Sequence, residues 1–154
     1  MDHAVINAPF GQLRLTADRD TLTGIEFLLE REALKKPASA ILKKTQAQLD
    51  AYFANPNHRF DLPMRLEGTA FQQSVWQALC DIQPGSPLTY GQLAKKLGTA
   101  PRAVGGACGS NPIPIIVPCH RVVSASGIGG FMKTRYLGPL NIKTWLLTHE
   151  QGKQ

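Results

Sequence analysis

The first sixty residues alternate short apolar segments with turn residues. Across residues 1–28, apolar runs of β-forming residues are separated by the sequences PFG (9–11) and DRDT (18–21), which are typical of turns between strands. In residues 39–55 the apolar side chains recur at the spacing of one helix face, at Ile41, Leu42, Leu49, Tyr52 and Phe53. The pattern predicts a small α/β unit, an antiparallel meander followed by a helix.

After residue 68 the apolar spacing becomes helical. Thr69 and Gln72 have the spacing of a capping box, and the apolar stripe that follows predicts a helix ending before PGSP (84–87). Near the C-terminus the spacing of five positions predicts a last helix. They are Leu140, Ile142, Trp145, Leu146 and His149.

Between these two helices the sequence has the outline of a helix-turn-helix. Thr89 and Gln92 form a second capping pattern, and Gly98 is placed to end the short helix that they begin. Three residues later, Pro101 occupies a favourable first helical position and begins another helix.

The second helix of this outline has an unusual composition. Gly105, Gly106 and Gly109 each cost up to about 1 kcal/mol relative to alanine in a helix interior. Either the glycines permit close packing inside the protein, or they let the helix backbone enter a narrow space such as a DNA minor groove. Arg102, a long cation among small residues, favours nucleic acid, although an ordinary surface arginine would look the same.

Length and composition indicate a folded globular protein. A chain of 154 residues with 43% hydrophobic and 18% charged residues is long enough for one core or two small cores that share an interface. We expect an α/β (α+β) fold with domains at residues 1–66 and 67–154. No long apolar segment begins the chain, so we expect no secretion signal or membrane span and a cytoplasmic location.

Charge and cysteine content narrow the functional classes. Residues 67–154 hold eight Lys and Arg against three Asp and Glu, which favours a polyanionic partner, although a solvated surface has the same composition. Cys80, Cys108 and Cys119 fit neither a disulfide framework nor a CxxC zinc site. Free thiols in a reducing compartment are the simpler interpretation.

Cys119 follows an apolar run with prolines at 112, 114 and 118, in the sequence PIPIIVPCHRVV (112–123). The prolines stiffen this run, and we expect a buried extended segment over residues 113–117. A rigid support of this kind suits a nucleophile that is aimed into a cleft. An inert buried cysteine beside a satisfied surface histidine is the alternative.

A reactive thiol also needs groups that favour its thiolate. His120 and Arg121 are the candidates in sequence, and His120 reaches Cys119 only if the backbone turns there or a water molecule bridges them. Of the carboxylates in the C-terminal half, we expect Glu150 to orient the imidazole, because it ends an amphipathic helix.

Taken together, these segments resemble the O6-alkylguanine-DNA alkyltransferases, also called methylated-DNA–protein-cysteine methyltransferases. The sequence NPIPIIVPCHRVV (111–123) is similar to the active-site motif of that family. The segments TYGQLAKKLG, PRAVGGACGSNP and WLLTHE fall in the family's order and approximate spacing. The resemblance covers residues 69–150, and the first sixty residues match loosely.

The resemblance implies DNA repair by single-turnover transfer of an alkyl group from O6-alkylguanine, and from O4-alkylthymine, in duplex DNA to Cys119. The helix-turn-helix would bind the minor groove and flip the guanine into a pocket. His120 would take the thiol proton through a water molecule, Glu150 would hold the imidazole, and Tyr90 would protonate the leaving guanine. Because the thioether product has no good leaving group, each molecule would act once.

The same resemblance implies roles in binding. Arg102 matches an arginine finger that fills the gap left by the flipped base, and Asn111 matches a hinge asparagine. The backbone carbonyls of Cys119 and Val122 would accept from the exocyclic amine of guanine. The expected DNA-binding residues are Tyr90, Arg102, Ala103, Gly105, Gly106 and Arg121, and the expected structural or pocket residues are Asn111, Pro114 and Val122.

The segment GIGGFMKTRYLGPL (127–140) departs from the family, whose glycine-rich loop after the cysteine is usually shorter. The zinc ligands of some relatives are also missing, so we expect no metal and no cofactor. The expected partner is double-stranded DNA containing O6-alkylguanine, bound by a monomer that does not associate with membranes.

Two other functional classes fit parts of the sequence. A module that recognises alkylated DNA without transfer is one, but the alkyltransferase-like proteins replace the cysteine, whereas this chain has Cys119. A cysteine hydrolase using Cys119, His120 and Glu150 is the other; it would turn over repeatedly and would not need Tyr90 or Arg102.

Overall fold

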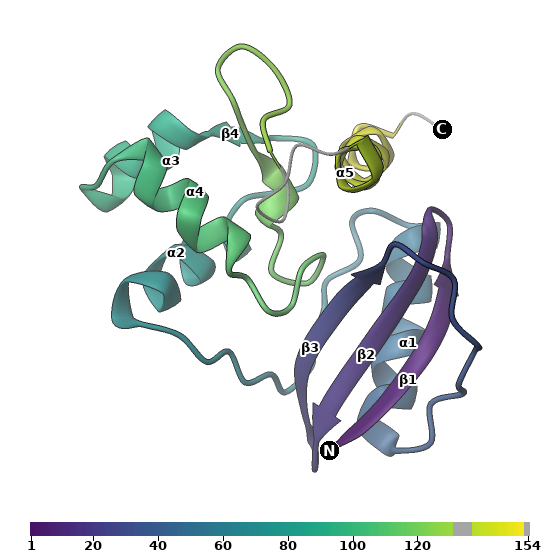
Figure 1. The fold of residues 1–154 in the computed structure, drawn as a ribbon. Coiled ribbons are helices and arrows are strands. Elements are labelled where there is room, and N and C mark those ends of the chain that lie inside the picture. Colours follow the sequence, from purple (N-terminus) through teal and green to yellow (C-terminus); the bar gives the residue numbers. More distant parts are fainter. Residues whose placement is uncertain (131–136, 153–154) are drawn as a thin grey trace. The chain divides into compact units, whose positions relative to one another are not determined.

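The computed structural model describes residues 1–130 and 137–152 (Figure 1). By its internal contacts the chain divides into two compact units, residues 1–66 and 67–154, and each is described by itself. A three-stranded sheet lies in the first unit and most of the helices lie in the second, so the expected mixed α/β fold is confirmed.

The first unit is built on an antiparallel sheet in the order β1-β2-β3. Its strands are β1 (Asp2–Ala8), β2 (Gly11–Asp18) and β3 (Thr21–Leu28), joined by the two predicted turns. Along β2 every second side chain, from Leu13 to Ala17, is fully buried, as expected for a strand with one face on the core. The predicted meander is confirmed.

Helix α1 (Ala40–Ala54) packs on this sheet and completes the core of the first unit (Figure 1). Ser39 caps it by accepting a hydrogen bond from the backbone N–H of Leu42 at 3.3 Å. Four of its five predicted apolar side chains are buried, including Leu49 and Tyr52, which are 0% exposed, and Phe53 is half-buried. Each fully buried leucine contributes roughly 1.5–3 kcal/mol relative to an exposed one.

Four helices form most of the second unit: α2 (Ala70–Cys80), α3 (Tyr90–Leu97), α4 (Pro101–Gly109) and α5 (Leu137–Glu150). A short turn that contains Gly98 joins α3 to α4, as the sequence predicts (Figure 1). Gly98 adopts φ 67°, a left-handed conformation that favours glycine and ends the helix.

The predicted helix starts are correct because they depend on local chemistry. Thr69 and Gln72 make both hydrogen bonds of a capping box at α2. Thr89 and Gln92 do the same at α3. None of the helices within residues 1–130 and 137–152 combines the length and the apolar character needed to cross a membrane.

The expected extended segment at residues 113–117 is wrong. The chain turns there: the backbone N–H of Val117 donates to the carbonyl of Ile113 at 2.9 Å, and Ile115 has φ 74°. Pro112 and Pro114 have no N–H to donate to a sheet, so the segment closes on itself. The segment is nevertheless buried, as predicted.

A two-residue parallel pairing follows the cysteine. Residues Cys119–Arg121 form a single 3-10 turn, and β5 (Val122–Val123) then pairs with β4 (Leu88–Thr89). This pairing connects the cysteine turn to the segment immediately before α3.

Candidate active site

Cys119 is held by the turn that precedes it. The side chain of Asn111 accepts from the N–H of Ile113 at 3.0 Å and donates to the carbonyl of Val117 at 2.7 Å. The N–H of Cys119 in turn donates to the same Val117 carbonyl at 2.8 Å. Asn111 therefore ties together the two ends of the turn, and it leaves Cys119 buried at 3% exposure.

The backbone does turn at Cys119, so His120 is not forced to the opposite side of an extended strand. His120 is 0% exposed, and its Nε2 lies 2.8 Å from Oε2 of Glu150. The structure thus pairs the histidine with the carboxylate selected from the sequence, thirty residues away. Nδ1 of His120 is buried and has no hydrogen-bond partner among the residues that the structure describes.

Arg121 fixes the other side of the Glu150 carboxylate. Its Nε and Nη2 donate to the two carboxylate oxygens, each at 2.9 Å, and its Nη1 donates to the carbonyl of Ile82 at 2.6 Å. Burial disfavours the carboxylate, but its bonds to His120 and Arg121 outweigh burial and lower the pKa of Glu150 to about 2. Glu150 is therefore ionised at neutral pH.

This carboxylate defines the state of the imidazole. Burial lowers the pKa of His120, and the contact with Glu150 only partly offsets that effect, so the ring is neutral. A neutral ring that faces an ionised carboxylate through Nε2 carries its proton there. Nδ1 then holds a free lone pair that can accept a proton.

The thiol is protonated in the free protein. Burial raises the pKa of Cys119 to about 11, while a hydrogen bond from Asn111 and the charge of Lys143 act in the opposite direction. Burial raises the pKa of Cys108 further, to about 12. Cys119 consequently needs a base before it can act as a nucleophile.

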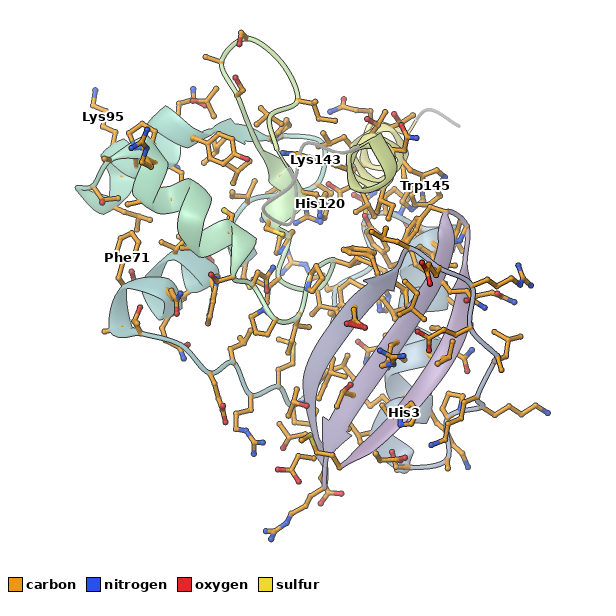
Figure 2. All side chains as sticks on the ribbon, viewed as in Figure 1. His3, Phe71, Lys95, His120, Lys143 and Trp145 are labelled. Atoms are coloured by element: carbon orange, nitrogen blue, oxygen red, sulfur yellow. The ribbon has the colours of Figure 1, made fainter. Side chains whose placement is uncertain are left out.

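Lys143 is a member of the site that the sequence interpretation missed. It lies on α5, is 0% exposed, and donates from Nζ to the carbonyls of Val122 at 2.7 Å and Gly130 at 2.8 Å. Figure 2 labels Lys143 next to His120, beside α5. Lys143, Leu146 and Glu150 are spaced at i, i+3 and i+7, so they share one face of the helix. This spacing is the sequence signal that could have indicated that Lys143 is buried.

Tyr90 lies against residues 129–130 and close to Lys143. The Tyr90 hydroxyl lies 3.4 Å from the Gly130 carbonyl, and the Lys143 ammonium lies 5.7 Å from the centre of the Tyr90 ring. Gly129 has φ 78°, and a Cβ there would lie 3.0 Å from Cε2 of Tyr90. A side chain at position 129 would therefore displace the tyrosine.

The exposed side of α4 is made of small residues and one cation. Arg102 and Gly106 are exposed, and Ala103 and Gly105 are half-buried. A Cβ at Gly106 would meet nothing within 4 Å, so packing inside the protein does not require glycine there. Of the two explanations for the glycines, this geometry favours a backbone surface that is kept bare.

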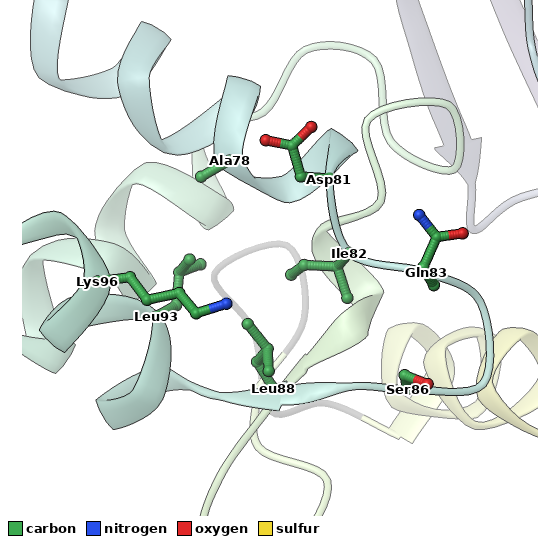
Figure 3. Close-up of a pocket in the computed structure, with 8 residues that line it drawn as sticks. All are labelled: Ala78, Asp81, Ile82, Gln83, Ser86, Leu88, Leu93 and Lys96. Carbon is green, nitrogen blue, oxygen red and sulfur yellow. The ribbon is translucent and has the colours of Figure 1, made fainter.

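Other predicted features lie elsewhere. Residues 131–136, within the segment 127–140 that departs from the family, fall outside the described residues. A separate hollow of about 250 Å³ is shown in Figure 3; it is lined by Ile82, Leu88 and Leu93, with Asp81 and Lys96 among its polar residues, and Cys119 does not line it. Within the described part of the chain, no three His, Cys, Asp or Glu side chains are grouped as metal ligands would be.

The arrangement around Cys119 can generate and use a thiolate. It combines a buried thiol, a neutral imidazole with one free lone pair and an ionised carboxylate that fixes the imidazole. The phenol of Tyr90 and the ammonium of Lys143 lie together, with the ammonium 5.7 Å from the centre of the ring.

Family models match both units. Residues 70–152 match the DNA binding domain of 6-O-methylguanine DNA methyltransferase, and residues 1–66 match its ribonuclease-like domain.

Individual proteins agree with the family models. A methylated-DNA–protein-cysteine methyltransferase of Methanosarcina acetivorans is 40% identical, with 97% of this chain and 98% of that protein covered. The crystal structure of O6-methylguanine methyltransferase from Mycobacterium tuberculosis superposes with a TM-score of 0.84 at 40% identity, covering 100% of this chain and 95% of that one. A structure of OGT from the same organism in complex with DNA gives 0.80 at 40% identity, covering 96% and 91%.

Proposed function

Because the chain belongs to the 6-O-methylguanine DNA methyltransferase family, we propose that it repairs DNA by moving the alkyl group of O6-alkylguanine, and of O4-alkylthymine, onto Cys119. The observation that carries this proposal is the buried set of Cys119, His120 and Glu150, in which the carboxylate fixes a neutral imidazole. The protein is then both the catalyst and the acceptor of the alkyl group.

The first step is removal of the thiol proton. Nδ1 of His120 is the base, and the proton reaches it from Cys119 through one water molecule. Glu150 stabilises the imidazolium that forms, because its carboxylate already accepts from Nε2 at 2.8 Å. In the free protein the pKa of Cys119 is raised and the pKa of His120 is lowered, so this proton transfer is unfavourable. The thiolate therefore forms only during the reaction with the alkyl group.

In the second step the sulfur attacks the alkyl carbon. A carbon–sulfur bond forms as the carbon–O6 bond breaks, and the electron pair of that bond leaves with the guanine. Tyr90 supplies the proton that neutralises the departing base. Its phenol carries a proton that it can donate, and the resemblance of the TYGQLA segment to the family assigns it this role. The resulting thioether cannot be displaced by water, so each molecule reacts once.

Recognition of DNA is assigned to α3 and α4 as a helix-turn-helix. The small residues Ala103, Gly105 and Gly106 would allow the α4 backbone to approach the minor groove, and exposed Arg102 would occupy the space of the flipped base. The open space beside Gly106 supports this proposal.

Arg121 is better explained as a positioning residue than as a phosphate contact. Among the described residues it makes three side-chain hydrogen bonds, all within the protein, and its side chain is 12% exposed. By holding Glu150, it keeps the imidazole in one orientation. We therefore reassign it from the DNA-binding set to the support of Glu150.

The decisive experiment is the stoichiometry of methyl transfer. Wild-type protein incubated with excess duplex containing O6-methylguanine should gain one CH2 on the peptide that carries Cys119 and should stop after one equivalent. Cys119→Ser should bind the duplex and gain nothing. An unmodified Cys119 together with tight lesion binding would support a pure recognition module, and repeated turnover on an ester or peptide would support a hydrolase.

Arg102→Ala tests the base-flipping part separately. We expect repair of the duplex to slow by ten- to a hundredfold, roughly 1–3 kcal/mol, with little change for a free O6-benzylguanine substrate that needs no flipping. Lys43→Ala is the matched control, since Lys43 is an exposed lysine of the other unit. Equal losses on both substrates would contradict the role of Arg102.

We also propose that the protein works as a monomer in the cytosol. The unpaired state of Cys80, Cys108 and Cys119 supports a reducing compartment, because oxidation of Cys119 would consume the acceptor.

A further inference from the structure

Two glycines border the ring of Tyr90. A Cβ added at Gly129 would lie 3.0 Å from Cε2 of the ring and 3.4 Å from its hydroxyl oxygen. A Cβ added at Gly105 of α4 would lie 4.0 Å from Cε1, which is an ordinary van der Waals separation. The side of the ring at Gly129 is therefore the tighter one, and the ring can lie there because residue 129 has no side chain.

The short parallel pairing brings Gly129 and the ring together. Strands β4 and β5 pair, and Tyr90 and Ser124 are the residues that directly follow them. The chain then turns back, because the N–H of Gly127 donates to the carbonyl of Ser124 at 3.3 Å. A Cβ at Gly129 would also lie 3.2 Å from the backbone nitrogen of Ser124. A methyl group at residue 129 would thus meet backbone on one side and the tyrosine on the other, and the side chain moves more easily than the backbone.

Backbone conformation alone does not account for this contact. Gly129 has φ 78°, and Gly152 has a similar φ of 75°, but a Cβ at Gly152 would meet nothing within 4 Å. Among the residues that the structure describes, Gly129 is the glycine that combines a positive φ with a close approach to an aromatic side chain. Glycine at this position therefore has two consequences: it relieves backbone strain, and it leaves the space that Tyr90 occupies.

We propose that Gly129 is a positioning residue of alkyl transfer, whose missing side chain holds the Tyr90 phenol where it can protonate the departing guanine. This inference deepens the proposed function and rests on it. As the carbon–O6 bond breaks, its electron pair stays with guanine and the phenol proton moves to that anion. The tyrosinate that remains takes a proton from water. Gly129 gives and takes no proton, and it acts only through Tyr90.

The size of the effect follows from how far the ring would move. Proton transfer by a positioned acid typically contributes about 10²- to 10⁴-fold to a rate. A misplacement of about 1 Å can cost about a hundredfold. Relieving the 3.0 Å contact requires a smaller shift than that, so we expect Gly129→Ala to slow methyl transfer by about tenfold. Tyr90→Phe, which removes the acid altogether, should slow it by about a hundredfold or more.

The direct test compares two methyl donors that differ in their need for a proton. Methyl transfer to the peptide that carries Cys119 is measured with saturating O6-methylguanine duplex and, separately, with methyl iodide, whose iodide leaves without protonation. We expect Gly129→Ala to be about tenfold slower with the duplex, at an unchanged half-saturating duplex concentration, and to react with methyl iodide at the wild-type rate. Equal slowing with both donors would mean that the thiol is disturbed, and it would overturn the proposal.

A double-mutant comparison tests whether Gly129 acts through the hydroxyl. Adding Gly129→Ala to Tyr90→Phe should cause no further loss with the duplex, because the group that the glycine positions is already gone. A further tenfold loss in the double variant would show that Gly129 acts by another route and would overturn the proposal.

Two alanine variants separate the contact from its structural side effects. Gly127→Ala adds a methyl group to open space in the same segment, and Gly152→Ala imposes a similar positive φ away from Tyr90. Both should transfer methyl groups from the duplex at the wild-type rate. If Gly127→Ala were as slow as Gly129→Ala, the contact with the tyrosine would not be the cause, and the proposal would fail.

The position of the ring can also be measured without DNA. The aromatic NMR signals of Tyr90, identified by their absence from Tyr90→Phe, should shift in Gly129→Ala and stay in place in Gly127→Ala. Unchanged signals in Gly129→Ala would overturn the positioning role whatever the repair assay shows. If wild-type Cys119 is never methylated by the duplex, the proposed function fails, whereas the NMR comparison still tests Gly129.

Discussion

The two units place their charged side chains in opposite ways. In the first unit, Arg14 pairs with Glu26 and Glu32 at the surface, and the exposed fractions of these side chains are 33% to 60%. In the second unit, Glu150 is 1% exposed and holds His120, which is 0% exposed, and Arg121. Surface pairs of the first kind are worth about 0–1 kcal/mol, whereas buried charges are costly unless every partner is present.

This difference shows that the second unit contains buried charges that can lower its stability. A core of the same volume could be made from apolar side chains, as the first unit does with Leu13, Leu15 and Leu49. The second unit instead buries Glu150 and Lys143 around one thiol. A pattern that folding alone does not require is best explained by chemistry at Cys119.

The largest effect should come from breaking the buried network. Glu150→Gln leaves Arg121 partly buried without its carboxylate, so we expect the free energy of unfolding to fall by about 3–5 kcal/mol. Urea unfolding measures this loss. Alkyl transfer by the variant should also slow, because the amide no longer fixes the tautomer of His120.

Glu26→Gln is the matched control in the first unit. It makes the same chemical change at a side chain that is 60% exposed, and it should cost less than about 1 kcal/mol. If the two substitutions had equal cost, the contrast between the units would not hold.

A second, smaller effect should appear in acid. The pKa of Glu150 is about 2 in the folded protein, below its usual value near 4.5, so its contribution is complete above about pH 4.5. That contribution is lost as the pH falls from about 4.5 toward 2, because over this range the unfolded state binds a proton at Glu150 and the folded state does not. At about 1.4 kcal/mol per pKa unit, the contribution is about 3 kcal/mol.

Urea unfolding at several pH values between 5 and 2 measures this dependence. The loss in wild type should exceed the loss in Glu150→Gln by that amount, since the variant has no carboxyl group to titrate at this position. Parallel curves for the two proteins would show that the buried carboxylate is not the group responsible.

The same contrast explains what could be predicted from the sequence. The meander, α1 and the starts of α2 and α3 depend on local signals, such as the capping box of Thr69 and Gln72, and these predictions are correct. The turn at residues 113–117 is also held by nearby residues, but its sequence does not show it. It closes through the Asn111 side chain and needs φ 74° at Ile115, an unfavourable conformation for a β-branched residue.

The site was only partly predictable for a related reason. The motif drew attention to Cys119 and His120, and Glu150 was found because few carboxylates exist in that half of the chain. Lys143 was not selected from the sequence, because lysine side chains are mostly exposed. Its burial depends on the carbonyls of Val122 and Gly130, which are distant in sequence.

The smallest effects test the surface of α4, where glycine is retained without a packing reason. Gly106→Ala places a methyl group in open space on a helix, so we expect it to raise the free energy of unfolding by about 0.5–1 kcal/mol while weakening duplex binding. Gly98→Ala, just before α4, should have the opposite effect on stability and lower it by about 1 kcal/mol, because Gly98 has φ 67°. Urea unfolding and duplex titration separate the two properties. A Gly106→Ala protein that is more stable and binds the duplex as tightly as wild type would show that the bare surface of α4 does not approach DNA.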